Sequence, residues 1–198
     1  MRYYLSLAVL VCVVMGMSGP AFAEMGLKLG ANLANWSGAS VSTQGKVGFQ
    51  LGGFVKQDLS DKFSMRYELL YSQKGANYSS SVTDGSNTYA VSYADNFDYV
   101  ELPVLFQYQA MPMLSLYAGP YVSYLLTAKT HIAISGASVD VDQLPNVNAL
   151  DYGAIAGLGV TLGNWVVDLR YELGLADVNK TGSSIRSNNM ALSAGYRF

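Results

Sequence analysis

Trp165-Val166-Val167-Asp168-Leu169-Arg170-Tyr171-Glu172-Leu173 carries a large apolar residue at every odd position. Its even positions include Asp168, Arg170 and Glu172. Successive side chains of a β-strand point to opposite faces, so this segment predicts a strand with one apolar face and one charged face. A helix would instead scatter the three charges around its surface.

The same period of two recurs through most of the 198-residue chain. It is clear again in Phe63-Ser64-Met65-Arg66-Tyr67-Glu68-Leu69-Leu70-Tyr71, where Arg66 and Glu68 take even positions. Scanning for this pattern predicts eight strands. They cover residues 26–36, 46–57, 62–74, 97–109, 114–127, 150–162, 165–176 and 189–198.

The connections between these strands alternate in length. Short gaps follow the second, fourth and sixth strands, at residues 58–61, 110–113 and 163–164, whereas the longest gaps are 75–96 and 128–149. Short turns at one end and long loops at the other are typical of bacterial outer-membrane barrels, whose long loops lie outside the cell. An even number of strands places both ends of the chain on the periplasmic side.

Charged residues make up only 13% of the chain, and most of those in strands fall on one face. A charge on the lipid-facing surface costs about 2–4 kcal/mol at mid-membrane, so a membrane barrel must turn these charges inward. The alternative, a soluble lipocalin-like barrel with its apolar face inside, would need many more charges facing water. We therefore predict a narrow lumen plugged by an ion-pair network of Lys28, Lys56, Arg66, Glu68, Glu101, Asp151, Asp168, Arg170, Glu172 and Arg197.

Large aromatic residues gather near both ends of the apolar face. Phe63, Tyr108, Trp165 and Phe198 fall beside the short turns, and Tyr71, Tyr124 and Tyr152 fall beside the long loops. Two rings of this kind match the aromatic girdles at the two interfaces of a membrane barrel, although core aromatics are the plain alternative.

Together these patterns predict an all-β fold: a closed eight-stranded antiparallel transmembrane β-barrel with up-and-down meander topology. Closure is required because lipid offers no partner for a free backbone N–H or C=O. Pro103 cannot donate to a ladder, so we expect a bulge to absorb it within the fourth strand. Asp84-Gly85 predicts a hairpin that extends the sheet beyond the membrane, and a second ribbon is expected to begin near His131.

The first 23 residues read as a secretory signal peptide. Arg2 precedes an apolar run over residues 5–14, and Ala21-Phe22-Ala23 forms a small-x-small cleavage site. An uncleaved anchor is the alternative. We predict a signal peptide at 1–23, a barrel domain at 24–198, and a location in the cell outer membrane after Sec-type export.

Composition narrows the possible chemistry. A single His and a single Cys are too few for most zinc sites, and a net charge of −2 without a basic run argues against nucleic acid as a partner. His131 has Ser135 four residues away on the same face, about 13 Å along an extended strand, too far to activate its hydroxyl. No catalytic residue, metal or cofactor is predicted.

Several short motifs resemble the small outer-membrane β-barrels often labelled "porin family", which share the architecture of OmpX- and OmpA-type barrels. The matching motifs are Gly26-Leu27-Lys28-Leu29-Gly30-Ala31-Asn32, Tyr99-Val100-Glu101-Leu102-Pro103, Gly157-Leu158-Gly159 and Ala194-Gly195-Tyr196-Arg197-Phe198. The last of these resembles the assembly signal read by the outer-membrane insertion machinery, with Tyr196 and Phe198 as its aromatic residues.

The resemblance implies three kinds of partner: outer-membrane lipid and lipopolysaccharide, the barrel assembly machinery, and an extracellular ligand or host surface reached through the loops. It carries over no catalytic residues. We predict a structural or surface-interaction role through the long loops. A small-solute channel and an outer-membrane lipid-modifying hydrolase are the alternatives.

Overall fold

The computed structural model describes residues 23–38, 43–84, 87–134, 137–180 and 185–198. The predicted signal peptide at 1–23 therefore lies outside the described residues, except for Ala23 at the start of the first strand. No helix among the described residues has the length and apolarity needed to cross a bilayer.

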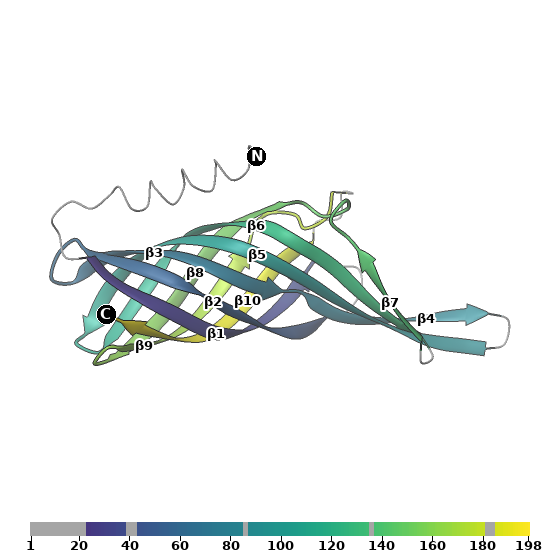
Figure 1. Ribbon diagram of the computed structural model, residues 1–198, viewed down its shortest axis with the longest axis horizontal. Coiled ribbons are helices and arrows are strands. Elements are labelled where there is room, and N and C mark those ends of the chain that lie inside the picture. Colours follow the sequence, from purple (N-terminus) through teal and green to yellow (C-terminus); the bar gives the residue numbers. More distant parts are fainter. Residues whose placement is uncertain (1–22, 39–42, 85–86, 135–136, 181–184) are drawn as a thin grey trace.

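The described residues form a ten-stranded antiparallel sheet (Figure 1). Its strands are β1 (Ala23–Ser37), β2 (Gln44–Asp58), β3 (Phe63–Lys74), β4 (Ala76–Asp84), β5 (Asn87–Met111), β6 (Leu114–Ile134), β7 (Ala137–Asp142), β8 (Leu150–Leu162), β9 (Trp165–Gly174) and β10 (Arg186–Arg197).

Eight of these strands close into a ring in the order β1-β2-β3-β5-β6-β8-β9-β10. β10 pairs with β1 from Gly26↔Arg197 to Ser37↔Arg186, which completes the circle. The predicted closed barrel of eight antiparallel strands with up-and-down topology is confirmed. β4 and β7 lie outside the ring and lengthen it at one end.

The alternation seen in the sequence separates the two faces of the barrel. On β9, Asp168, Arg170 and Glu172 are buried in the lumen. Trp165, Leu169 and their odd-numbered neighbours point outward and are half exposed. The outer surface is thus a band of apolar side chains, and the inner surface is polar, as a lipid-facing barrel requires.

The three short connections lie at the same end of the barrel as the C-terminus. They are residues 59–62, 112–113 and 163–164. Gly163 has a φ of 61° in its two-residue turn, a left-handed conformation that suits glycine.

At the opposite end, β4 and β7 carry the sheet beyond the ring (Figure 1). β4 pairs with β5 from Asn77↔Ala94 to Asp84↔Asn87, and β7 pairs with the end of β6. The two expected ribbons are therefore present, although the tips at 85–86 and 135–136 lie outside the described residues. We call the β4–β5–β6–β7 extension the projecting sheet.

β3 and β4 form one strand interrupted at Gly75. A Cβ at this position would lie 2.0 Å from the backbone oxygen of Asp95 on β5. A side chain at position 75 would therefore push the two strands apart where they leave the barrel. Glycine allows the strand to continue into the projecting sheet.

The bulge expected at Pro103 is absent. The β3–β5 ladder has the same register before and after it, with Leu70↔Glu101 on one side and Tyr67↔Val104 on the other. The ladder simply omits the pairs around the proline and resumes without an extra residue. The irregularities of β5 lie elsewhere, at Asp98/Tyr99 and at Gln109/Met111.

The inside-out arrangement can be tested with nitroxide spin labels at Leu69 and Leu169, which are 44% and 42% exposed. We expect both labels in bilayer-embedded protein to be relaxed by dissolved oxygen, which concentrates among acyl chains. A control label at Ser138 on β7 should instead be relaxed by a water-soluble reagent. Water-like accessibility at Leu69 and Leu169 would contradict the outward orientation of the apolar face.

Candidate functional site

An ion-pair network crosses the middle of the lumen, with Arg170 of β9 at its centre. One guanidinium nitrogen, Nη1, lies 2.8 Å from Glu68 of β3. The other, Nη2, lies 2.8 Å from Glu172, 3.3 Å from Glu101 of β5 and 2.6 Å from the side-chain oxygen of Gln50 on β2. β9 and β3 stand opposite each other in the ring, so this single side chain links the two walls.

A second group of contacts surrounds Lys28 and Arg66 on the side toward the short turns. The Lys28 amine lies 3.1 Å from Glu68 and 2.9 Å from Asp168. Arg66 lies 2.9 Å from Glu68 and 3.3 Å from Asp168, and its guanidinium stacks 4.3 Å from the ring of Tyr117. Each carboxylate therefore meets two or more cations, as buried charge requires.

Lys74, the last residue of β3, belongs to the same network but was missed from the sequence. Its amine lies 2.6 Å from Glu101 and 2.9 Å from Glu172, and it also faces the ring of Tyr121 at 4.7 Å. The signal was present, because position 74 continues the inward even positions of Arg66 and Glu68. Lys74 is the last residue of the predicted strand 62–74 and borders the long connection, where the alternation ends.

Asp151 on β8 lies in the lumen but meets no cation within ion-pair distance among the described residues. Its Oδ2 atom accepts hydrogen bonds from the hydroxyls of Tyr121, at 3.2 Å, and Ser123, at 3.5 Å. Its Oδ1 atom is buried without a protein partner. Asp151 is thus a polar neighbour of the network rather than a member of its ion pairs.

Lys56 and Arg197 also lie apart from the central network, at the short-turn end of the barrel. Arg197 lies 2.7 Å from Glu24, and Lys56 lies 3.5 Å from Glu24 and 2.9 Å from Asp58. These four side chains are partly exposed, unlike the central ones. They form a second, peripheral charge cluster that includes Glu24, the first residue after the predicted cleavage site.

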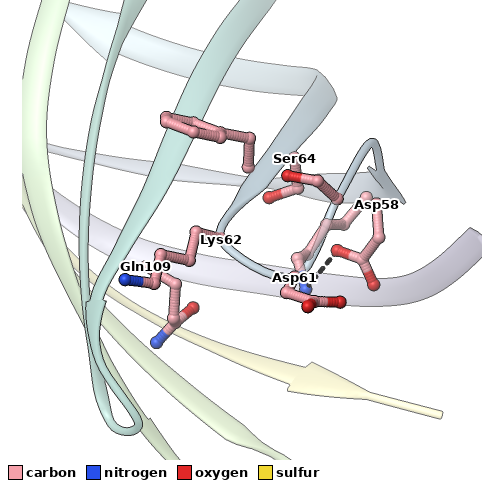
Figure 2. Close-up of a pocket in the computed structure, with 8 residues that line it drawn as sticks. Asp58, Asp61, Lys62, Ser64 and Gln109 are labelled. Atoms are coloured by element: carbon pink, nitrogen blue, oxygen red, sulfur yellow. Dashed lines mark ion pairs between the residues drawn. The ribbon is translucent and has the colours of Figure 1, made fainter.

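A pocket of about 240 Å³ opens beside this cluster (Figure 2). Asp61 and Lys62 come from the turn between β2 and β3, Asp58 ends β2, and Ser64 and Gln109 come from adjoining strands (Figure 2). Its lining holds charges of both signs and no buried catalytic arrangement. We regard it as the polar mouth of the lumen.

The opposite mouth is filled by apolar side chains. Trp36, Phe97, Tyr99 and Leu125 from the barrel wall pack with Val147 and Val178 from the two connecting segments β7–β8 and β9–β10. We call this group the apolar cap. It lies on the lumen side of the projecting sheet.

The two connecting segments are tied to each other above the cap. The backbone N–H of Asn148 donates to Val178 O at 2.8 Å, and the side-chain amide of Asn148 donates to Asp177 O at 2.7 Å. Lys180 N–H donates to Asn146 O at 3.2 Å. The segments therefore form a hydrogen-bonded lid over the mouth.

Asp95 fixes the cap to the root of the projecting sheet. Its carboxylate accepts a hydrogen bond from the indole N–H of Trp36 at 3.1 Å and from the hydroxyl of Thr130 at 2.7 Å. This buried contact joins β1, β5 and β6. Sequence patterns gave no sign of it, because Asp95 lay within a predicted loop.

The predicted aromatic residues all lie on the outer face. Near the short turns, Phe63 contacts Tyr108 with ring centroids 5.2 Å apart, and Trp165 contacts Tyr196 at the same separation. Phe198 is 73% exposed at the same end, and its backbone N–H donates to Met25 O. At the other end, Tyr124 and Tyr152 are exposed and Tyr71 is half-buried.

The projecting sheet has two faces of different character. Tyr78 and Tyr93 stack across β4 and β5 with centroids 4.8 Å apart, on the face that also carries Ile132 and Val139. Burial, with Asp95 and Tyr93 nearby, raises the pKa of Tyr78 to about 12, so this phenol stays protonated at physiological pH. The opposite face is polar and includes Ser79, Ser92, His131, Asp140 and Asp142.

No catalytic arrangement is formed around His131 within the part of the chain that the structure describes. Its Nδ1 atom lies 2.7 Å from Asp140, and both side chains are exposed on the projecting sheet. Ser135, the candidate nucleophile weighed above, lies outside the described residues. The described residues also contain no group of three or more His, Cys, Asp or Glu side chains placed to hold a metal.

Comparison with protein families decides the identity of the fold. Residues 18–180 match the family described as "Outer membrane protein beta-barrel domain". The chain belongs to this family. The predicted family and the predicted location in the cell outer membrane are both confirmed. A search of curated proteins found no match to this barrel domain.

Solved structures place the barrel domain among small outer-membrane barrels. Neisserial surface protein A is 14% identical and has a TM-score of 0.52, with 89% of this chain and 99% of that chain covered. Ail of Yersinia pestis, in complex with the heparin analogue sucrose octasulfate, is 14% identical with a TM-score of 0.50 over 89% and 99% of the two chains. At this identity the likeness concerns the fold.

We expect Arg170→Met to lower the free energy of unfolding of the barrel domain by about 3–5 kcal/mol, because it leaves three buried carboxylates short of a cation. Asp151→Asn should change it by less than about 1 kcal/mol, because no cation loses its partner. Urea titration in lipid vesicles, followed by the gel shift between folded and heated protein, measures both. Arg170→Lys should fall between wild type and Arg170→Met.

Equal losses in Arg170→Met and Asp151→Asn would contradict the central place of Arg170. If Arg170→Met does not insert into vesicles, the ranking of Arg170→Lys against Asp151→Asn still decides the question.

Proposed function

We propose that this protein is a closed outer-membrane barrel that presents its projecting sheet to a partner outside the cell. The observation that carries the proposal is the projecting sheet itself. The ring is already complete with eight strands, yet β4, β7 and the ends of β5 and β6 extend well past it. Barrels of this class carry their longer loops on the extracellular side.

The filled lumen supports a binding role over solute passage. The ion-pair network occupies the middle of the barrel, and the apolar cap and its lid occupy the mouth beside the projecting sheet. Eight strands already give a lumen only wide enough for side chains to fill. A channel would require several of these buried contacts to open together.

The charge of the long-loop end bears on the kind of partner. Ail was solved with a heparin analogue, which is a polyanion. The described long-loop end of this chain mixes acidic and basic side chains: Asp98, Asp140, Asp142 and Asp177 with Lys46, Lys129, Lys180 and Arg186. A surface with this balance does not favour a sulfated glycan.

The predicted aromatic girdles and the predicted assembly signal both support a barrel embedded in the outer membrane. We propose that the two rings of outward-facing aromatic side chains lie at the two headgroup layers, where Trp and Tyr are favoured. The outer layer holds lipopolysaccharide, the lipid partner predicted from the resemblance. Exposed Tyr196 on β10 and Phe198, which follows β10, are the side chains we assign to recognition by the barrel assembly machinery.

The binding role predicts that the barrel survives loss of both ribbons of the projecting sheet. Tyr78 pairs directly with Tyr93, and Thr130 pairs directly with Val141, so a single variant can replace residues 79–92 and residues 131–140 each by an Asn-Gly turn that keeps the register. We expect this variant to keep its heat-dependent gel shift but to lose attachment of expressing cells to cultured host-cell monolayers. Cells carrying wild type or an empty vector set the two limits. Full attachment by the trimmed variant, or none by wild type, would contradict the proposal.

The filled lumen predicts that the protein conducts no ions across a bilayer. We expect purified wild-type protein in planar lipid bilayers to give no steady single-channel steps, because the ion-pair network and the apolar cap both obstruct the lumen. Removing the cap alone, by Trp36→Ala with Val178→Ala, should leave the bilayer silent while the central network remains. Reproducible unitary steps from wild type would favour the channel alternative.

A further inference from the structure

The free edge of β7 is the least protected part of the projecting sheet. β7 pairs with β6 from Lys129↔Asp142 to Ile134↔Ala137. No strand pairs with its other side among the described residues, so the backbone groups along that side have no ladder partner. A row of free N–H and C=O groups is a template for an added strand.

The side chains of β7 divide cleanly between two faces. Val139 and Val141 are 57% and 37% exposed on the apolar face of the projecting sheet. Asp140 and Asp142 are exposed on the polar face. A strand added at this edge would place its own side chains beside these, alternating between an apolar and an acidic neighbour.

The usual protections of an edge are missing here. β7 contains no proline, no lysine and no glycine. Its protection is the pair of carboxylates, and that protection is selective. Asp140 and Asp142 repel an acidic strand, including β7 of a second copy, but attract a basic one. Across from these two carboxylates stands one permanent cation, Lys129 opposite Asp142, while His131 contacts Asp140.

The other free edge of the projecting sheet lacks this selectivity. β4 presents Ser79, Ser80 and Ser81 along the portion beyond its pairing with β2. Hydroxyl groups can accept many partners but do not discriminate by charge. Only the β7 edge, of these two, can therefore discriminate between basic and acidic partner strands.

Resting on the proposed surface-binding function, we infer that β7 binds an extended polypeptide segment in which basic and apolar side chains alternate. The segment adds as a further strand to the projecting sheet. Main-chain hydrogen bonds supply the affinity, while Asp140 and Asp142 set the preference for Lys or Arg at alternate positions.

The test uses full-length protein in nanodiscs and three labelled synthetic peptides. One alternates lysine with valine, the second alternates glutamate with valine, and the third is the lysine peptide with N-methyl groups at alternate amides. Fluorescence anisotropy should show the lysine peptide binding about tenfold more tightly than the glutamate peptide. The N-methylated peptide, with the same charge but a blocked ladder, should bind at least tenfold more weakly than its parent.

Charge reversal provides the matched variants. Asp140→Lys with Asp142→Lys should reverse the preference between the lysine and glutamate peptides. Asp177→Lys, which changes an exposed charge on the lid instead, should leave the preference as in wild type. The heat-dependent gel shift checks that each variant folds. If the double lysine variant does not fold, Asp140→Asn with Asp142→Asn replaces it, and this variant should abolish the preference.

Several outcomes would overturn the inference. Equal binding of the N-methylated peptide would reduce the effect to charge alone, and an unchanged preference after reversal at 140 and 142 would place the site elsewhere. Hydrogen exchange should also slow at residues 137–142 when the lysine peptide binds, and unchanged exchange there counts against the edge. If these results fail while the ribbon-trimmed variant still loses attachment, the surface-binding function stands and only the β7 edge is wrong.

Discussion

Placing charge inside a cylinder surrounded by lipid is the constraint on which this structure depends. Charged side chains cannot face acyl chains, so every strand turns them into the lumen, where each must find an opposite charge or a hydrogen bond. Arg170 meets this demand by reaching across to β3 and β5 while also contacting Glu172 on its own strand. The network that results fills the space that eight strands enclose. The contacts that satisfy the buried charges therefore also block the lumen.

The two ends of the barrel solve different problems. At the short-turn end, four side chains pair where water still reaches them, so their contacts are partly exposed: Glu24, Lys56, Asp58 and Arg197. At the other end, the lumen finishes in the apolar cap, and Asp95 anchors Trp36 to the root of the projecting sheet. The ion-pair network in the middle and the apolar cap above it therefore both hold the barrel walls together. The projecting sheet, which lies beyond the membrane, extends from this braced ring.

The strand count, the closure and the direction of each face followed from a period of two, because that period is set by backbone geometry and lipid allows only one orientation. Contacts between distant strands were harder. Lys74 and Asp95 lay at or beyond the predicted strand ends, and Lys56 and Arg197 face inward at a height that only the stagger of the barrel determines. Pro103 was expected to require a bulge, yet the ladder tolerates a gap there because one missing donor costs less than a shift of register, which would turn every following side chain to the wrong face.

The pairing of β1 with β10 has a consequence for how the chain reaches this form. These are the first and the last strands of the ring, and the hydrogen bond from Phe198 to Met25 sits at their shared margin. No neighbouring strand can replace either partner. The barrel therefore stays an open sheet, with unpaired backbone groups along β1 and β10, until these two distant strands meet. Bringing together strands so far apart in sequence has a large entropy cost, which slows this step. Until it is complete, the open sheet exposes its apolar face. Until that seam forms, the two open margins can therefore pair with another chain, and the contact that completes the ring also removes this risk.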